Sequence, residues 1–239
     1  MLVCDLDGTL VGDRDSTHQL LAWLAPKRQD IALVFNTGRS ALSTHQLIEE
    51  AALPWPDALV TGLGTAISFH EQADGAAGSS PDPEWHGFVS QEWSSALVEE
   101  ITGRFAPELV AQEEIAQTDL KKSFTLLHER VLPPLKEALI ENRMAARFVQ
   151  TESLLDVIPA RAGKQSAVLH LQRRFGTAPA DVVVCGDSEN DLDMLLGASK
   201  AIVVGNATRG LLAALGGNAF RARADAAAGI LEGLIHLGW

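Results

Sequence analysis

Two aspartates separated by a single residue are the clearest chemical signal in the sequence. Asp5 and Asp7 follow an apolar run and are themselves followed by Gly8 and Thr9. Alternate residues of an extended chain share a face, so both carboxylates can point into one crevice. Two like charges that close together raise each other's pKa unless a cation lies between them. The pair therefore predicts a divalent metal ion, and hard oxygen ligands favour Mg²⁺.

A second pair of carboxylates supports the same chemistry. Asp187 and Asp191 follow an apolar run at residues 182–184, and their spacing suits metal ligation together with support of the metal ligands. Gly8 allows the backbone to turn, and Thr9 is expected to bond a neighbouring main-chain group. Taken alone, however, the first pair could also be a plain acidic β-turn.

Residues that could bind an anion lie between the two pairs. Thr37, Gly38 and Arg39 follow an apolar run, and Ser40 then caps a predicted helix, whose free N-terminal amides can bind anions. The alternatives are a simple capping turn and, for Arg39, a solvated surface charge. Lys164 is expected in the first turn of another helix, where its charge opposes the helix dipole. A bound anion would relieve that conflict, so Lys164 is a candidate phosphate ligand, with a surface lysine as the alternative.

Short buried strands must position these residues. Repeated strand, polar turn and helix predict right-handed βαβ units and an α/β fold with a Rossmann-like doubly wound parallel sheet. Ligands of such sheets bind beyond the C-terminal ends of the strands, which places Thr37 beside Asp5 and Asp7. The Gly62-Leu63-Gly64 motif lacks the second βαβ half of a dinucleotide site and is better explained by a tight hairpin. The expected strands are residues 2–6, 31–35, 58–61, 181–185 and 201–204.

The middle of the chain has a different rhythm and predicts an inserted α+β cap. Residues 72–83 are rich in Ala, Asp, Gly, Ser and Pro, which indicates a flexible boundary. We expect a core domain of residues 1–82 and 160–239, with the cap at 83–159. A module over a catalytic crevice usually supplies substrate contacts and excludes water. Lys121 and Lys122 are candidate sugar or phosphate contacts, with a solvated lysine pair as the alternative. Within the cap the pattern predicts an amphipathic segment at 85–105, strands at 122–128, 146–150 and 154–158, and a helix at 131–142.

Composition excludes several classes of partner. The 239 residues are 46% hydrophobic and carry a net charge of −12, which argues against nucleic acid or an anionic membrane surface as partner. No apolar run approaches the ~18 residues of a membrane span, and no signal-peptide pattern is present. Cys4 and Cys185 lie in predicted buried strands and are expected to be reduced core residues. A cytoplasmic location fits these observations.

Taken together, the motifs resemble the haloacid dehalogenase (HAD) phosphatase superfamily with a C2-type cap. The resemblance rests on the order and placement of Asp5-x-Asp7-Gly8-Thr9, Thr37-Gly38-Arg39, Lys164, and Gly186-Asp187 through Asp191. More narrowly, the chain is similar to the sucrose-phosphatase family. That similarity is carried by Thr37-Gly38-Arg39-Ser40, residues 85–93, Asp156-Val157-Ile158-Pro159 and Ala228-Gly229-Ile230-Leu231-Glu232.

The resemblance assigns roles to individual residues. Asp5 would be the nucleophile that becomes an aspartyl-phosphate, and Asp7 would protonate the leaving oxygen and then activate water. Asp5, Asp187 and Asp191 would hold Mg²⁺, to which Asp7 would contribute mainly its main-chain carbonyl. Thr37, Gly38, Arg39, Lys164 and Asn190 would bind the phosphate end of the substrate, and Lys121 would reach the distal sugar.

The resemblance thus implies a Mg²⁺-dependent phosphatase that hydrolyses sucrose 6-phosphate to sucrose and phosphate, in sucrose biosynthesis. The alternative substrates are mannosylfructose phosphate, mannosylglycerate phosphate and glucosylglycerate phosphate. A HAD phosphomutase shares the same core. A phosphoryl receiver domain also carries an acidic cluster, but it needs neither a cap nor the second carboxylate of the first pair. An association with a glycosyl-phosphate synthase is left open.

Overall fold

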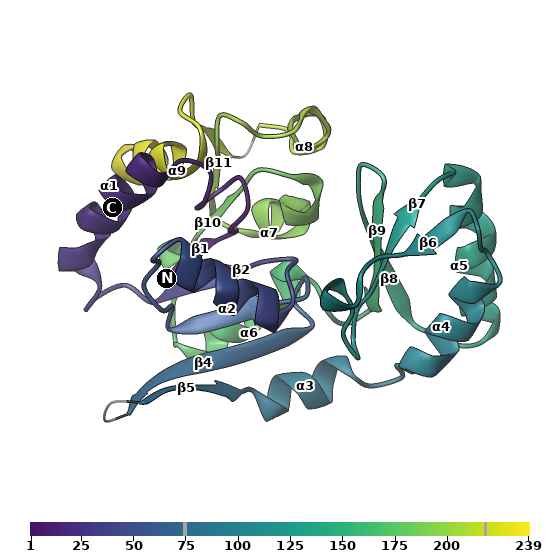
Figure 1. Cartoon of the computed structure of the whole chain (residues 1–239). Helices are drawn as coiled ribbons and strands as arrows, with labels where there is room; N and C mark the ends of the chain where they lie inside the picture. Colours follow the sequence, from purple (N-terminus) through teal and green to yellow (C-terminus); the bar gives the residue numbers. More distant parts are fainter. Residues whose placement is uncertain (74–75, 218) are drawn as a thin grey trace.

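Two β-sheets organise the part of the chain that the computed structural model describes, residues 1–73, 76–217 and 219–239 (Figure 1). The larger sheet has eight strands in the order β12-β11-β10-β1-β2-β3-β4-β5, and the smaller has four in the order β6-β7-β9-β8. The strands of the larger sheet are β1 (Leu2–Cys4), β2 (Leu33–Asn36), β3 (Ala58–Thr61), β4 (Ala66–Ala73), β5 (Ala76–Pro81), β10 (Val183–Gly186), β11 (Lys200–Val203) and β12 (Phe220–Arg221). Those of the smaller sheet are β6 (Leu109–Ala111), β7 (Lys122–Leu126), β8 (Ala146–Thr151) and β9 (Leu154–Pro159).

Six neighbouring strands of the large sheet, from β12 to β3, are parallel, which confirms the doubly wound fold. Every residue of β1, β2, β3 and β10 is buried, because their near-continuous apolar sequence packs against helices on both faces. The chain order reverses between β1 and β10, where Cys4 lies in register with Cys185. Both cysteines are buried and free. The carboxyl ends of β1 and β10 therefore meet at the point where such sheets bind ligands.

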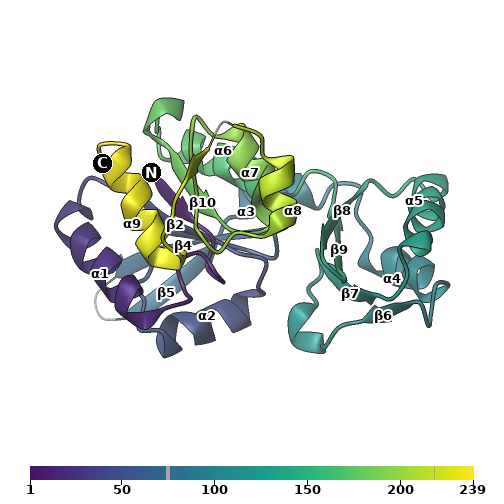
Figure 2. The ribbon, with the colours of Figure 1, turned by 90° about the horizontal axis from the view of Figure 1, so that it is seen from above.

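Helices cover the large sheet in two layers (Figure 2). Leu20 of α1, Ile48 of α2 and Ile230 of α9 belong to the apolar cluster on one face. Apolar side chains of α3, α6, α7 and α8 belong to the cluster on the other face. The helices of these two layers are α1 (Arg14–Leu24), α2 (Ala41–Glu50), α3 (Pro83–Val89), α6 (Lys164–Arg174), α7 (Leu192–Gly197), α8 (Arg209–Ala214) and α9 (Ala226–His236).

The sheet is extended by two antiparallel strands that the sequence does not predict in full. The predicted hairpin after β3 is confirmed, since β4 pairs with it antiparallel. The prediction of a flexible boundary is wrong for residues 76–81, which form β5 and pair with β4. Their Ala, Gly and Ser side chains give no strand pattern, and the strand is stabilised by main-chain pairing with β4. Of the predicted boundary, residues 74 and 75 lie outside the described residues.

The small sheet is covered on one face by α4 (Ser95–Gly103) and α5 (Leu132–Glu141), and its other face is turned toward the core (Figure 1). The predicted strands and the helix near residues 131–142 are confirmed. The amphipathic segment at 85–105 is instead two helices, α3 and α4. Trp85 of α3 belongs to the core cluster, and its indole N–H donates to the Gly64 carbonyl (3.1 Å). The domain boundary at 82/83 stays a prediction. Among the described residues, none of the helices has the length and apolar character needed to cross a bilayer.

Candidate active site

The loop after β1 is shaped to approach the loop after β10. Gly8 has φ +74°, and its N–H donates to the Val11 carbonyl (2.8 Å). A Cβ at Gly8 would lie 2.4 Å from Oδ2 of Asp187, so only glycine permits this approach. The Asn206 amide donates to the Gly8 carbonyl (2.8 Å) and holds the loop from the other side. Asn206 was not predicted as a site residue, although it follows β11 and the rule that ligands bind at strand ends could have indicated it.

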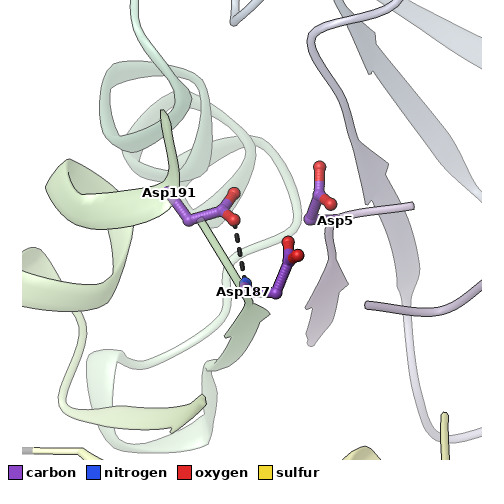
Figure 3. A group of neighbouring side chains, drawn as sticks. All are labelled: Asp5, Asp187 and Asp191. Atoms are coloured by element: carbon purple, nitrogen blue, oxygen red, sulfur yellow. Dashed lines mark hydrogen bonds between the residues drawn. The ribbon is translucent and has the colours of Figure 1, made fainter. Parts of the chain in front are cut away.

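Three carboxylates converge at the ends of β1 and β10 (Figure 3). Asp5, Asp187 and Asp191 each present an oxygen atom, and these atoms lie within 4.8 Å of one another. Oδ2 of Asp191 accepts the main-chain N–H of Asp187 (3.1 Å), which fixes the loop (Figure 3). Thr9 donates to Oδ1 of Asp187 (3.0 Å), so its partner is this carboxylate and not the main-chain group expected. The structure therefore brings together three of the four residues predicted to hold a metal ion.

The electrostatics of this group favour a bound cation. Burial raises the pKa of Asp5 to about 8, opposed by Lys164 and reinforced by Asp191 and Asp187. The expected cause of a raised pKa was the neighbouring Asp7, whereas burial and the other two carboxylates raise the pKa of Asp5. Burial and Asp191 also raise the pKa of Asp187 to about 6. A divalent cation among these oxygen atoms would favour the ionised carboxylates, so the donor set fits Mg²⁺.

Lys164 is the buried cation of the site. Its ammonium lies 2.6 Å from Oδ1 of Asp5 and 2.6 Å from Oδ1 of Asp191. Burial alone would lower its pKa, but the two carboxylates raise it above its usual value, so the ammonium stays charged. The residue is 1% exposed, which rules out the surface-lysine alternative. These carboxylates already relieve the conflict with the helix dipole, and a phosphate contact stays a prediction.

Asp7 and Arg39 form a pair at the mouth of the site. The Arg39 guanidinium donates to both carboxylate oxygens of Asp7, each at 2.7 Å. Arg39 also donates to the Ser43 hydroxyl, and its main-chain N–H donates to Oγ1 of Thr37 (3.2 Å). Arg39 is therefore not a free surface charge. The Asp7 carboxylate is not part of the three-carboxylate group, and its predicted main-chain contact to the metal stays a prediction.

A cavity of about 370 Å³ lies over these residues, between the core and the smaller sheet. It brings together the predicted residues Asp5, Asp7, Thr37, Gly38, Arg39, Lys121 and Asn190. Its other lining residues include Gln112, Ile115, Thr151, Leu154 and Asp156 from the cap. Of these five, only Asp156 was predicted, as part of a family motif. The others lie in a loop, a 3₁₀ helix and two strands whose orientation the sequence does not reveal.

The two cap lysines have different environments. Lys121 lines the cavity, is 4% exposed, and donates to the Ser123 hydroxyl (2.7 Å) and to Asp156 (3.2 Å). Lys122 instead pairs with Glu99 of α4 (2.5 Å), because successive residues point to opposite sides of an extended chain. The alternative of a solvated lysine pair is therefore wrong. Of the two lysines, only Lys121 lines the cavity and is placed to contact a substrate.

Comparison with known proteins decides the family. The model of the sucrose-6F-phosphate phosphohydrolase family matches residues 1–238. The chain belongs to this family. Its members are phosphoric monoester hydrolases, as the predicted resemblance implied.

Individual relatives agree with this assignment. Sucrose-phosphatase 1 of Nicotiana tabacum is 30% identical over 99% of the chain, which spans only 58% of that relative's length. Mannosylfructose-phosphate phosphatase of Agrobacterium fabrum is 31% identical over the whole chain and 96% of that protein.

Solved structures share the fold of this chain. The sucrose-phosphatase of Synechocystis, solved in complex with sucrose and phosphate, matches with a TM-score of 0.88 and 28% identity over 99% of this chain and 97% of that one. A haloacid dehalogenase-like hydrolase from Bacillus subtilis, 17% identical, shares the fold with a TM-score of 0.69. The match covers 99% of this chain and 90% of the Bacillus chain. The HAD fold predicted from the sequence is thereby confirmed.

Proposed function

We propose that the chain is a Mg²⁺-dependent phosphatase that hydrolyses sucrose 6-phosphate to sucrose and phosphate through an aspartyl-phosphate. One observation carries the proposal: Asp5, which forms a buried ion pair with Lys164 and belongs to the three-carboxylate group, lines a cavity shared by core and cap. Family membership and the Synechocystis relative, solved with sucrose and phosphate, support the choice of substrate.

The first step transfers the phosphoryl group to Asp5. Lys164 holds Oδ1 of Asp5, which leaves Oδ2 to attack phosphorus. As the Asp5–phosphorus bond forms, the bond from phosphorus to the sugar oxygen breaks, and Asp7 donates a proton to that oxygen. Arg39 binds both oxygens of Asp7 in the free site and orients this side chain, and one of the two contacts breaks so that the freed oxygen can carry the proton. Thr37, Gly38 and Asn190 line the same cavity and would contact the phosphate oxygens.

The second step regenerates the enzyme. Asp7, now ionised, accepts a proton from water as the water oxygen attacks phosphorus, and the bond to Asp5 breaks. Asp5 returns to the carboxylate, held by Lys164, and inorganic phosphate leaves. Asp5, Asp187 and Asp191 would hold Mg²⁺, which when bound offsets the negative charge of the phosphoryl group.

The proposal is tested by substrate choice and by metal removal. Multiple turnovers of phosphate should appear with Mg²⁺ and disappear with a chelator. The kcat/KM for sucrose 6-phosphate should exceed that for fructose 6-phosphate, because binding energy from the second sugar ring helps to close the cap and align the phosphate. Equal values for both esters would contradict the disaccharide assignment.

Other outcomes of this assay identify the alternatives. A preference for mannosylfructose phosphate, mannosylglycerate phosphate or glucosylglycerate phosphate would keep the mechanism and change the substrate. An isomeric sugar phosphate as product would indicate a mutase. A single phosphorylation without turnover would indicate a receiver domain.

A second prediction concerns Lys164. Lys164→Ala removes the only ammonium group that contacts Asp5 among the described residues. We expect a loss of about 2–4 kcal/mol of transition-state stabilisation, measured as kcat/KM. The matched control is Lys122→Ala, which removes another buried, paired lysine that points away from the cavity and should leave kcat/KM nearly unchanged. A loss below about tenfold for Lys164→Ala would remove this residue from the mechanism.

A further inference from the structure

One ion pair joins the smaller sheet to the core among the described residues. Arg147 of β8 donates from Nη2 to Oδ2 of Asp193 in α7 (2.9 Å). Strand β8 is an edge of the smaller sheet, one face of which is turned toward the core (Figure 1). Asp193 lies two residues after Asp191, a member of the three-carboxylate group. The pair therefore connects the cap to the segment that supplies one of the predicted metal ligands.

The same guanidinium also contacts the segment that leads into Lys164. Its Nη1 donates to the Ala162 carbonyl (3.3 Å), two residues before the lysine. Oδ2 of Asp193 accepts in addition the main-chain N–H of Gln165 (3.2 Å), one residue after it. Arg147 and its partner carboxylate thus bind the main chain on both sides of Lys164.

The residue between these contacts lacks a side chain, and the contact requires this. Gly163 has φ +142° and precedes α6 without a side-chain cap. A Cβ at Gly163 would lie 2.2 Å from Nη1 of Arg147 and 3.1 Å from Oδ2 of Asp193. The guanidinium therefore packs directly on the Gly163 main chain, which is a closer fit than a surface ion pair needs.

Next to these contacts, a space separates part of β8 from the core. A second cavity, of about 380 Å³, lies between β8 and the core loops. Its walls include Arg147, Gln150, Lys164, Asn190 and Asp193. Leu63 and Asn190 line both this cavity and the one over Asp5. Val149 of the same strand packs against the core cluster, and Arg147 adds the polar contacts that fix how the cap edge sits on the core.

We propose that Arg147 is a positioning residue that latches the cap onto the core and, through Ala162, Gly163 and Asp193, holds Lys164 between Asp5 and Asp191. Cap placement and the alignment of the lysine are then coupled through one side chain. The inference rests on the proposed function for its kinetic consequence only. The coupling itself is a property of the contacts.

The test compares Arg147→Met with Arg130→Met. Methionine keeps an unbranched apolar stem and removes the charge and the hydrogen bonds. Arg130 is the matched control, since it pairs with Glu108 inside the cap and makes no contact to the core among the described residues. We expect Arg147→Met to lower kcat/KM about tenfold and to speed amide hydrogen exchange at residues 162–167. Arg130→Met should change neither, and Arg147→Lys should give an intermediate result, because one ammonium cannot span both acceptors.

A double-mutant cycle with Asp193→Asn distinguishes loss of the specific contact between Arg147 and Asp193 from general destabilisation of the protein. The double variant should lose no more activity than the more affected single variant, because both remove the same contact. Additive losses would overturn the proposal, and so would unchanged exchange at residues 162–167 in Arg147→Met. If the wild-type chain does not hydrolyse sucrose 6-phosphate, the proposed function fails, whereas the exchange measurement needs no substrate and still tests the latch.

Discussion

Replacing Asp5 by asparagine is expected to abolish phosphoenzyme formation and turnover. An amide has the shape of the carboxylate, but its oxygen is a far weaker nucleophile, so no aspartyl-phosphate can form. The measurement is phosphate release together with acid-trapped phosphoenzyme, both of which should fall to background. Lys164 would keep its contact to Asp191, so the fold should persist.

The same substitution has an expected effect that needs no activity. The pKa of Asp5 is raised from 3.8 to about 8 in the folded protein, so the metal-free fold loses stability as the pH rises through this interval. The asparagine side chain would carry no such charge and would attract the cation less. The rise in melting temperature on adding Mg²⁺ should therefore be smaller for Asp5→Asn than for wild type. Turnover retained by Asp5→Asn would contradict the assignment of the nucleophile.

Asp7→Asn is expected to be almost as damaging, but at a different point of the cycle. General acid–base catalysis contributes about 10²–10⁴-fold, and the amide can neither donate nor accept the proton. With p-nitrophenyl phosphate the leaving oxygen needs no proton, so the first step should survive. The variant should then release about one p-nitrophenolate per site in a burst and stall as phosphoenzyme, as expected when only the second step is blocked.

Arg39→Met is the control for this second prediction. It leaves the Asp7 carboxylate in place and removes the guanidinium that holds both its oxygens. With sucrose 6-phosphate it should slow both steps, because the acid–base group is disordered and not deleted. With p-nitrophenyl phosphate it should continue to turn over after the first p-nitrophenolate and not stall as phosphoenzyme, because Asp7 can still accept the proton from water. If Asp7→Asn kept most of the wild-type activity on sucrose 6-phosphate, Asp7 would not be the acid–base group.

Much of the scaffold could be predicted because its strands are continuous apolar runs. Residues 2–6 and 181–185 are predicted as buried strands, and the rule that ligands bind at the carboxyl ends of parallel strands brings Asp5 close to Asp187. Strand β5 could not be predicted in this way. Its Ala, Gly and Ser residues carry no period, and its pairing depends on the main chain of β4.

Side-chain partners were the part that the sequence could not supply. Lys164 stands out for its place in a helix, but its carboxylate partners lie 159 and 27 positions away in the sequence. Asp7 and Arg39 are both candidates, yet nothing in the spacing indicates that they bind each other. Arg147 carries no motif at all, and its proposed role follows only from its contacts with Ala162 and Asp193 and its close approach to the Gly163 backbone.

The strand order also determines when this site can form as the chain folds. The four strands of the smaller sheet, β6 to β9, lie within residues 109–159, and the most distant residues that they pair, Lys122 and Val157, are 35 positions apart. The pairing of β1 with β10 joins Leu2 to Val183 and cannot begin until β10 has been synthesised. Closing such a distant pair is slow, because the entropy of the intervening chain must be lost before the contact forms. The cap can therefore fold as a local unit on the nascent chain, and Asp5, the proposed nucleophile, meets Lys164 only in the late stage of folding.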